Sequence, residues 1–172
     1  MVATENVRAA LPGLIDELGV KTMLDLPCGD SYWIVNCLPT DIKYIGGDVV
    51  PEIITRNQAI NTQLGDFHVL DLVSDVLPPA DLLLVRDCLI HLPNSMVQRA
   101  LINIRRAEIS YLLTTTYPEI VENVEIEIGG FRKLNLEHAP FNLPKPICLI
   151  GENESGKAMG LWHNSALETI AL

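Results

Sequence analysis

The sequence is short of positive charge and of paired cysteines, and each shortage excludes a class of protein. Lysine and arginine together number 12, against 22 aspartates and glutamates, so the 172-residue chain has a formal net charge of −10. Nucleic-acid binding draws much of its free energy from basic side chains that neutralise phosphates, so we expect no nucleic-acid partner. The four cysteines are scattered, with no CxxC pair and no clustered histidines. We therefore expect neither a metal site nor a disulfide framework.

Long apolar runs are also missing. No stretch approaches the roughly 18 uncharged apolar residues that a membrane span requires. The N-terminus MVATENVRAALPG lacks the basic start and the continuous apolar stretch of a signal peptide. These absences predict a cytoplasmic protein with no membrane partner. Because 48% of the residues are hydrophobic, the chain can bury a full core, and we expect a single domain spanning residues 1–172.

What is present is an alternation of short β-rich runs with helical patterns. Strands are predicted, in chain order, in LGVKTMLDL, KYIGGD, DFHVLD, ADLLLVRD and ISYLLTTTY. The fourth and fifth runs are almost continuously apolar, as is typical of strands buried on both faces of a sheet. The alternation indicates an α/β fold that is Rossmann-like, with a mostly parallel, doubly wound sheet and helices on both faces.

Two helices are predicted between these strands. One lies in PEIITRNQAINTQL, where Pro51 suits the first helical position, and the other follows the fourth strand, where Ser95 and Gln98 have capping-box spacing. Each helix should bury a stripe of side chains, formed by Ile53, Asn57, Ile60 and Leu64 on the first and by Val97, Ala100, Leu101 and Ile104 on the second.

After Tyr117 the helical pattern stops. The following segment is rich in glycine, proline and asparagine, which favours loops. PICLIG and KAMGLWH then predict two last strands, an antiparallel pair at the C-terminal end of the sheet.

The turn in LDLPCGDSYW follows the first predicted strand, and ligands of open α/β sheets bind at such carboxyl ends. A phosphate-binding turn would need glycines and free backbone N–H groups. Here Pro27 lacks an N–H, Asp30 adds a carboxylate, and no lysine or arginine occurs between Thr22 and Ile42. The turn therefore suits a ligand that carries positive charge on an amine or a sulfonium.

Between Val20 and Tyr117, the order and spacing of the motifs resemble those of class I S-adenosylmethionine-dependent methyltransferases. The family's first motif, an acidic residue followed by GxGxG, is represented by DLPCGDS, in which Pro27 and Ser31 replace the outer glycines. RDCLIHLP, YLLTTTYP and GGFRKLNL are similar to segments of a group of small bacterial members. The resemblance implies S-adenosylmethionine as cofactor, S-adenosylhomocysteine as product, and cofactor contacts from Asp25, Pro27, Cys28, Gly29 and Asp30.

The same resemblance assigns roles after the next strands. Asp48, which ends KYIGGD and is followed by Val49, would bind the ribose hydroxyls. Asp71 in FHVLDL would meet the adenine amine, with Leu72 beside it, and Arg86 in RDCLIHLP would border the cofactor.

Each of these assignments has a structural alternative. Asp25 could cap its own turn, and Asp48 could interact with the start of the following helix. The role of Asp71 could belong to Asp66 or Asp75. Cys28 is more easily read as a small turn residue than as a nucleophile, while Tyr32 and Trp33 could cover the cofactor or form the core face of a first helix.

Methyl transfer needs an acceptor held in line with the carbon–sulfur bond, and a base only where the acceptor must lose a proton. We expect a small-molecule acceptor, Asp87 as base or substrate orienter, and His91 as its partner unless His91 simply packs beside the next helix. Tyr117 would line the mouth of the site. Arg132 would serve as the cation for an acidic acceptor, or would be exposed without a role.

Two other functions stay open. The chain could be a catalytically silent Rossmann-like domain that binds a nucleoside ligand or a protein partner. A nicotinamide-dependent oxidoreductase is disfavoured by Pro27 and Asp30. The acceptor site could be open, formed by the loop Val121–Pro146, or shared with a second copy of the chain in a homo-oligomer.

Overall fold

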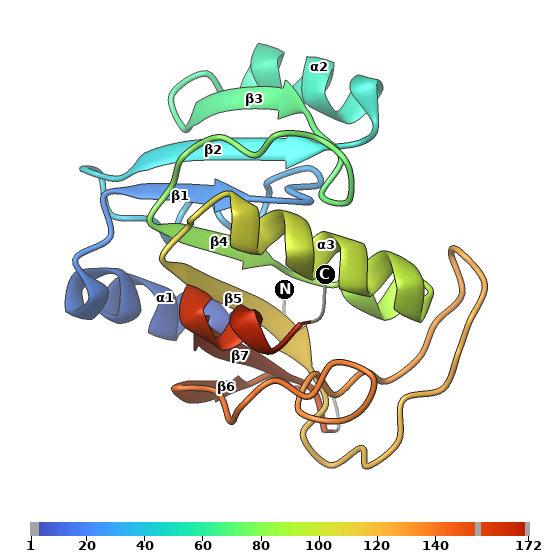
Figure 1. The fold of residues 1–172 in the computed structure, drawn as a ribbon. Helices are drawn as coiled ribbons and strands as arrows, with labels where there is room; N and C mark the ends of the chain where they lie inside the picture. The colour runs from blue at the N-terminus through green and yellow to red at the C-terminus, as the bar shows by residue number, and fades with distance from the viewer. Residues whose placement is uncertain (1–3, 154–155, 171–172) are drawn as a thin grey trace.

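The computed structural model describes residues 4–153 and 156–170. Its strands form one seven-stranded sheet (Figure 1), in the order β3-β2-β1-β4-β5-β7-β6. Neighbours among β1 to β5 pair in parallel, whereas β7 pairs antiparallel with both β5 and β6. The predicted mostly parallel sheet with an antiparallel C-terminal pair is confirmed. The strands are β1 (Thr22–Asp25), β2 (Lys43–Asp48), β3 (Gly65–Val69), β4 (Leu82–Val85), β5 (Tyr111–Thr116), β6 (Cys148–Gly151) and β7 (Ala158–His163).

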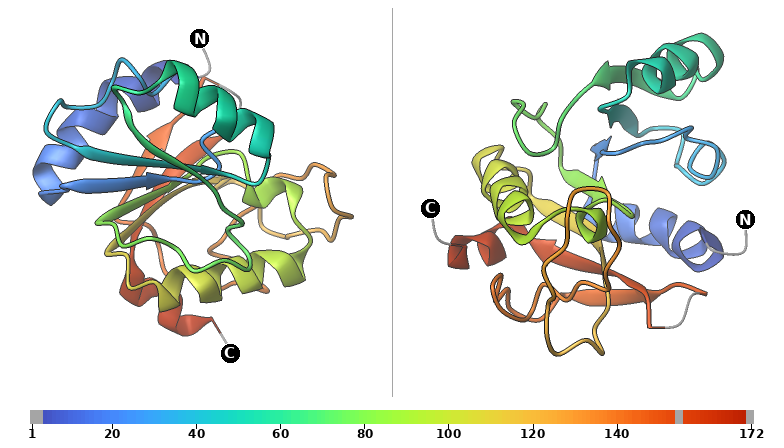
Figure 2. Two further views of the ribbon diagram at one scale, coloured as in Figure 1. Left: turned by 90° about the horizontal axis from the view of Figure 1, so that it is seen from above. Right: turned by 90° about the vertical axis from the view of Figure 1, so that its right-hand side faces the viewer.

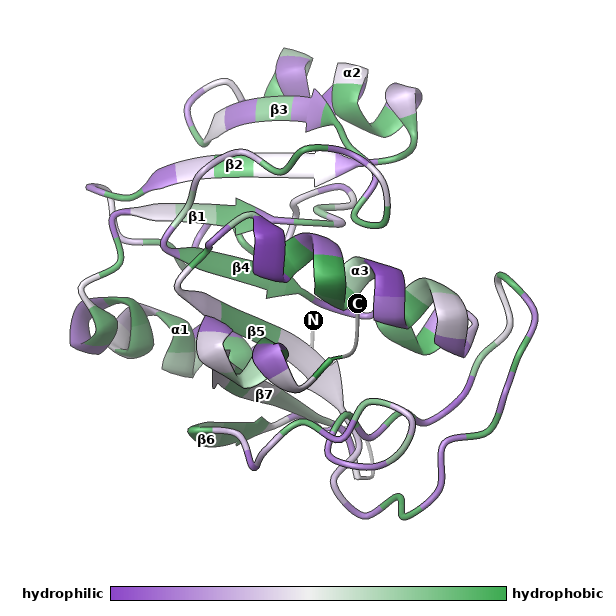
Figure 3. Ribbon diagram, viewed as in Figure 1, coloured by the Kyte–Doolittle hydropathy of each residue, from purple (hydrophilic) through white to green (hydrophobic). Residues whose placement is uncertain are grey.

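Helices cover both faces of the sheet, as the two perpendicular views show (Figure 2). α1 (Glu5–Leu18) and α2 (Pro51–Ile60) pack into one buried apolar cluster, and α3 (Asn94–Arg106) and the 3₁₀ helix η3 (Asn164–Thr169) pack into another. β4 separates the two clusters: Leu82 and Leu84 point to the first, and Leu83 and Val85 to the second. Its continuous hydrophobicity (Figure 3) therefore follows from burial on both faces.

α3 buries the predicted face but begins differently from the prediction. Val97, Ala100, Leu101 and Ile104 are all buried. The predicted capping box of Ser95 and Gln98 is wrong, because the helix begins at Asn94 and no side chain of its own N-cap residue, Pro93, can cap it. The cap comes from a distant loop instead, since Glu125 Oε1 accepts a hydrogen bond from the Asn94 N–H at 2.9 Å.

α2 begins at Pro51 as predicted, but its buried face is narrower than expected. Ile54 and Asn57 are buried, whereas Ile60 is 61% exposed. The helix ends at Ile60, so Leu64 lies beyond it, in the turn that leads into β3. In place of the expected apolar stripe, α2 buries one apolar residue, Ile54, and one polar residue, Asn57.

The connection from β1 to β2 contains no helix: residues 26–42 form successive turns. The first helix that would have carried Tyr32 and Trp33 is therefore absent. α1 lies before β1 and was not among the predicted elements, although Val7, Leu11 and Ile15 form a buried stripe with helical spacing. Pro12 and Gly13 lie in the middle of α1. Because both residues disfavour helix interiors, the local sequence does not predict a helix here.

Residues 117–147 contain no helix or strand, as the composition predicted, and part of this segment projects beyond the carboxyl ends of the parallel strands (Figure 1). Among the helices of the two described ranges, none combines the length and the apolar character that crossing a membrane would require.

Candidate functional site

Two cavities lie at the carboxyl ends of β1, β2 and β4, and both are lined by Pro27. The first, of about 260 Å³, is lined by three aspartates, and the second, of about 290 Å³, is almost entirely apolar. We call them the acidic cavity and the apolar cavity. The acidic cavity is lined by Asp25, Pro27, Cys28, Gly29, Asp30, Trp33, Asp48 and Arg86. The apolar cavity is lined by Leu26, Pro27, Val49, Leu70, Asp71, Leu72, Val73, Cys88, Leu92 and Met96.

The turn that was singled out in the sequence forms the wall between these cavities. Gly29 has a φ of 53°, in the left-handed region that favours glycine, so the one glycine kept from the GxGxG pattern stands where the backbone needs it. Ser31 has a φ of 54° and also adopts this conformation, at a position where the pattern would place glycine. The Cys28 N–H donates to the Gly47 carbonyl at 2.7 Å, which ties the turn to β2.

Asn57, on α2, holds the turn in place through its side-chain amide. Its side chain is fully buried, and Nδ2 donates to the Gly29 carbonyl at 2.7 Å. Nδ2 also lies 3.5 Å from the Ser31 hydroxyl. Sequence reasoning placed Asn57 on the inward stripe but gave it no role in the site. A buried asparagine among apolar positions was the available signal, because such a side chain must find hydrogen-bond partners.

Asp48 interacts with the start of the following helix and also reaches the cavity wall. Its Oδ1 accepts a hydrogen bond from the Val50 N–H at 3.0 Å, just before α2, and its Oδ2 accepts one from the Gly29 N–H at 3.2 Å. The side chain also lines the acidic cavity. Since each carboxylate oxygen can accept more than one hydrogen bond, Asp48 can still bind a ligand hydroxyl.

Asp25 does not cap its turn. It is 2% exposed, and its Oδ2 accepts a hydrogen bond from the Tyr44 hydroxyl at 2.8 Å. Burial raises the pKa of Asp25 to about 7, although the Tyr44 hydrogen bond and the charge of Arg86 oppose this shift. Near neutral pH this carboxyl group is therefore poised between its neutral and ionised forms.

Asp30 and Trp33, which follow Gly29 in the turn segment, form the outer wall of the acidic cavity. Asp30 is exposed, and its Oδ1 accepts a hydrogen bond from the Tyr32 N–H at 3.1 Å. Trp33 is half-buried and lies against Arg86, with 5.8 Å between the guanidinium carbon and the ring centroid. Tyr32, in contrast, is 64% exposed and does not line the cavity.

Asp71 stands at the edge of the apolar cavity, where Leu72 and Val49 also contribute to the wall. Its Oδ1 accepts from the Val73 N–H at 2.8 Å, and its Oδ2 accepts from the Ser74 hydroxyl at 2.7 Å. Of the competitors, Asp75 bonds to the Asp71 N–H, whereas Asp66 lies near the start of β3, away from the carboxyl ends. Asp71 is thus the aspartate of this group that lines the cavity.

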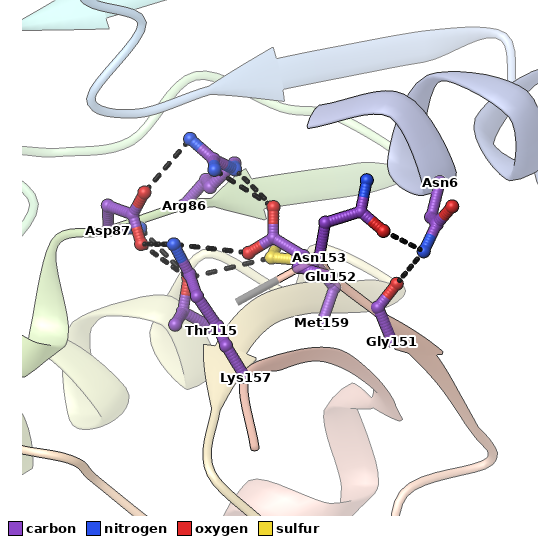
Figure 4. A network of polar contacts seen from close by, with 9 residues as sticks. All are labelled: Asn6, Arg86, Asp87, Thr115, Gly151, Glu152, Asn153, Lys157 and Met159. Atoms are coloured by element: carbon purple, nitrogen blue, oxygen red, sulfur yellow. Dashed lines mark hydrogen bonds and ion pairs between the residues drawn. The ribbon is translucent and has the colours of Figure 1, made fainter. Parts of the chain in front are cut away.

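Beyond β4, four charged side chains of alternating sign join (Figure 4) and connect the site to the β6–β7 hairpin. Arg86 contacts Glu152 through Nε and Nη2, each at 2.9 Å from Oε1, and its Nη1 lies 2.9 Å from Asp87 Oδ2. The Lys157 Nζ is 2.6 Å from Asp87 Oδ1 and 3.2 Å from Glu152 Oε2. We call these four residues the charged quartet. Sequence reasoning missed Glu152 and Lys157. Glu152 lies 66 residues along the chain from Arg86, and Lys157 is farther still from Asp87.

His91 and Asp87 make separate contacts. The Asp87 carboxylate bonds within the quartet, and Thr115 lies 3.4 Å from it. His91, in the 3₁₀ helix η2 (Leu89–His91), has its Nδ1 at 2.7 Å from the Gly130 carbonyl. Because a carbonyl can only accept, Nδ1 must carry the proton, and Nε2 of a neutral ring is free of one.

Two predicted substrate residues are wrong, because both are buried. Tyr117 is 1% exposed and packs in the core, so it does not line an open mouth. Arg132 is 3% exposed; its guanidinium donates to the Asn94 side chain and to the Leu92 carbonyl, at 2.6 and 2.8 Å. It ties the projecting loop to the start of α3 and presents no cation to an acidic acceptor.

Cys28 is a buried turn residue. Burial and the nearby Asp25 raise the pKa of its thiol to about 12, so it remains protonated at neutral pH and is a poor nucleophile. Within residues 4–153 and 156–170, no group of three or more His, Cys, Asp or Glu side chains is arranged to hold a metal ion.

The strand order and the strand pairing match the Rossmann-like fold of class I methyltransferases, and solved structures share it. Magnesium protoporphyrin IX methyltransferase from Synechocystis PCC 6803, solved with bound SAH, matches with a TM-score of 0.69 at 9% identity, over 94% of this chain and 84% of that one. The methyltransferase domain of a bacterial Hen1 matches with a TM-score of 0.67 at 14% identity, over 94% and 99%.

Human N-acetylserotonin methyltransferase, solved in complex with SAM, matches with a TM-score of 0.68 at 15% identity, over 93% of this chain. The match covers only 51% of the human chain, so the present chain spans about half of that protein's length. No protein-family model matches the sequence, and no curated protein matches it. At these identities the likeness establishes the fold, and the expected class I methyltransferase fold is confirmed.

Proposed function

We propose that the protein is an S-adenosylmethionine-dependent methyltransferase that acts on a small-molecule acceptor. The observation that carries the proposal is the pair of cavities that meet at Pro27, one apolar and one acidic, at the switch point of a methyltransferase-like sheet. S-adenosylmethionine has a flat nucleobase at one end and a positively charged amino-acid portion at the other, and it supplies the methyl group when bound.

The side chains present fit such a ligand. Asp71 and Leu72 would receive the adenine in the apolar cavity, and Asp48 would accept hydrogen bonds from the ribose hydroxyls. The acidic cavity would hold the amino-acid portion. Arg86 is its one basic side chain and would bind the ligand's carboxylate.

The protein's part in catalysis would be mostly positioning, since a methyl group can transfer once donor and acceptor are held in line. For an acceptor hydroxyl, Nε2 of His91 would accept the proton, because the Gly130 carbonyl fixes the ring in the suitable tautomer. Asp87, whose carboxylate is balanced by Arg86 and Lys157, is better suited to orient the acceptor than to act as a base.

A neutral or cationic acceptor fits the charges near His91. Residues 107–131 contain no lysine or arginine, and Arg132 is buried. Phe131 lies 6.0 Å from His91, measured between ring centroids, and is 55% exposed, so it could contact the apolar body of such an acceptor.

Calorimetry with S-adenosylhomocysteine tests the proposal. The wild type should bind, and Asp48→Ala should bind at least about tenfold more weakly, because one good hydrogen bond to a charged group contributes about 1.5–3 kcal/mol. Asp66→Ala is the matched control, since it removes an exposed carboxylate near the start of β3 and should leave the affinity unchanged.

Absence of binding by the wild type would refute the proposal. Binding of S-adenosylhomocysteine without methyl transfer to any member of an acceptor panel would favour the catalytically silent domain. Binding of NAD in its place would favour the oxidoreductase.

A further inference from the structure

Asp25 is an acid buried at the wall of a cavity that holds an excess of acids. Its side chain is 2% exposed, yet it lines the acidic cavity together with Asp30 and Asp48. Its hydrogen bond comes from the neutral hydroxyl of Tyr44, at 2.8 Å, and no ion pair reaches it among the described side chains. A carboxylate in this position would carry a buried negative charge without a close cation, which is costly.

The groups around Asp25 do not supply that cation. On β2, Asp48 adds a second negative charge that raises the pKa of Asp25. In the turn, Cys28 keeps its proton at neutral pH, and Asp30 is exposed. Beyond β4, Arg86 lowers the pKa of Asp25, but its guanidinium is already paired with Asp87 and Glu152.

We infer that Asp25 is the counter-ion of a positively charged group of the ligand, that it is protonated in the free protein, and that it ionises when this group binds. The inference rests on the proposed function. The carboxyl O–H bond breaks, the proton passes to solvent, and the carboxylate formed pairs with the ligand's cation. Tyr44 is a positioning residue here, because its hydroxyl holds Oδ2 of Asp25 and stabilises the ionised form.

The protonation behaviour of Asp25 supports this geometry. Burial raises its pKa to about 7, so the free site holds a proton below neutral pH. A cation that enters the same low-dielectric cavity favours the ionised carboxyl group and lowers its pKa again. Binding should therefore be coupled to proton release.

Calorimetry in two buffers of different ionisation enthalpy measures this coupling directly. At about pH 6 the wild type should release close to one proton for each S-adenosylmethionine bound, and the release should disappear by about pH 8.5. Asp25→Asn should bind without proton release. 5′-Methylthioadenosine, which lacks the amino-acid portion, should bind the wild type without proton release.

S-adenosylmethionine identifies which cation Asp25 meets. Proton release with both S-adenosylmethionine and S-adenosylhomocysteine assigns the ammonium group, which both contain. Release with S-adenosylmethionine alone assigns the sulfonium. Binding of both ligands by the wild type without proton release would overturn the inference and leave the proposed function intact, whereas failure of both ligands to bind would overturn the proposed function as well.

Tyr44→Phe separates positioning from a merely structural role. Removal of the hydroxyl takes away a hydrogen bond that lowers the pKa of Asp25, so proton release should persist to higher pH than in the wild type. Tyr32→Phe is the matched control, because it also removes a tyrosine hydroxyl, but Tyr32 lies on the turn segment after β1, is 64% exposed and should leave the midpoint unchanged. An unchanged midpoint in Tyr44→Phe would show that Tyr44 does not position Asp25.

Discussion

Asp25 also links the chemistry of the site to the stability of the fold. Its pKa of about 7 in the folded protein lies above the ordinary aspartate value of 3.8, so the folded state binds the proton more tightly than the unfolded state. The resulting stabilisation is complete at low pH and is lost as the pH rises through about 7. A single buried side chain thus makes the free protein less stable at the pH where the site is charged.

Asp25→Asn should remove this pH dependence. Because one pKa unit corresponds to about 1.4 kcal/mol, the free energy of unfolding of the variant relative to the wild type should rise by roughly 2–3 kcal/mol between about pH 5 and pH 8. Urea denaturation at the two pH values measures the difference. Asp30→Asn, at an exposed position in the same turn, should show no such change, and a constant difference for Asp25→Asn would contradict the prediction.

At single positions, the sequence predicts where a residue lies when its place along the chain determines its environment. Asp25 and Asp48 end parallel strands and Asp71 follows one, and the carboxyl ends of such strands necessarily meet at one edge of the sheet. Arg132 and Tyr117 failed because nothing in their local sequence shows that they are buried. Their burial depends on how a loop of some thirty residues folds back on η2 and α3.

Among elements, the strands were the most predictable because each buried strand needs a short apolar run. β2 begins and ends where KYIGGD does, and β4 lies inside ADLLLVRD. The helices were less predictable where tertiary contacts replace local signals. α3 takes its cap from Glu125, and α1 tolerates Pro12 because Val7, Leu11 and Ile15 pack against the sheet.

The charged quartet connects the β6–β7 hairpin to the site, and we expect the stability of the fold to depend strongly on these ion pairs. Lys157 and Glu152 have side chains that are 5% and 1% exposed. Lys157→Met would leave the other three charges with a net charge of −1, and of these the Glu152 carboxylate is fully buried. Breaking a buried ion pair from one side costs about 3–5 kcal/mol, so urea denaturation should show a loss of that size.

An exposed ion pair provides the control for Lys157→Met. Lys21 and Asp41 are 3.6 Å apart, with side chains 73% and 70% exposed, so Lys21→Met should cost less than about 1 kcal/mol. Adding Glu152→Gln to Lys157→Met restores a neutral set of charges and should recover part of the stability. Equal losses in the two single variants would show that burial of the quartet contributes nothing.

The molecule as a whole carries a net charge of −10, and its distribution bears on the acceptor. Three aspartates line the acidic cavity, and no lysine or arginine occurs in residues 107–131, which include Gly130, the partner of His91. The excess of negative charge creates an electrostatic field that attracts cations and repels anions. Salt screens this field over a distance of about 10 Å at 0.1 M ionic strength. Acceptor charge should therefore influence turnover even where the charged group is remote from the methylated atom.

Two acceptors that differ only in such a remote group, an amine in one and a carboxylate in the other, test this expectation. At low ionic strength, kcat/KM should be about tenfold or more higher for the amine, because the field raises the local concentration of cations. Added salt should lower kcat/KM for the amine and raise it for the carboxylate, so that the two values converge, while a neutral amide analogue should be insensitive to salt. A carboxylate preferred at low salt would show that the acceptor meets a cation despite the net charge of −10, and would locate it away from the buried Arg132.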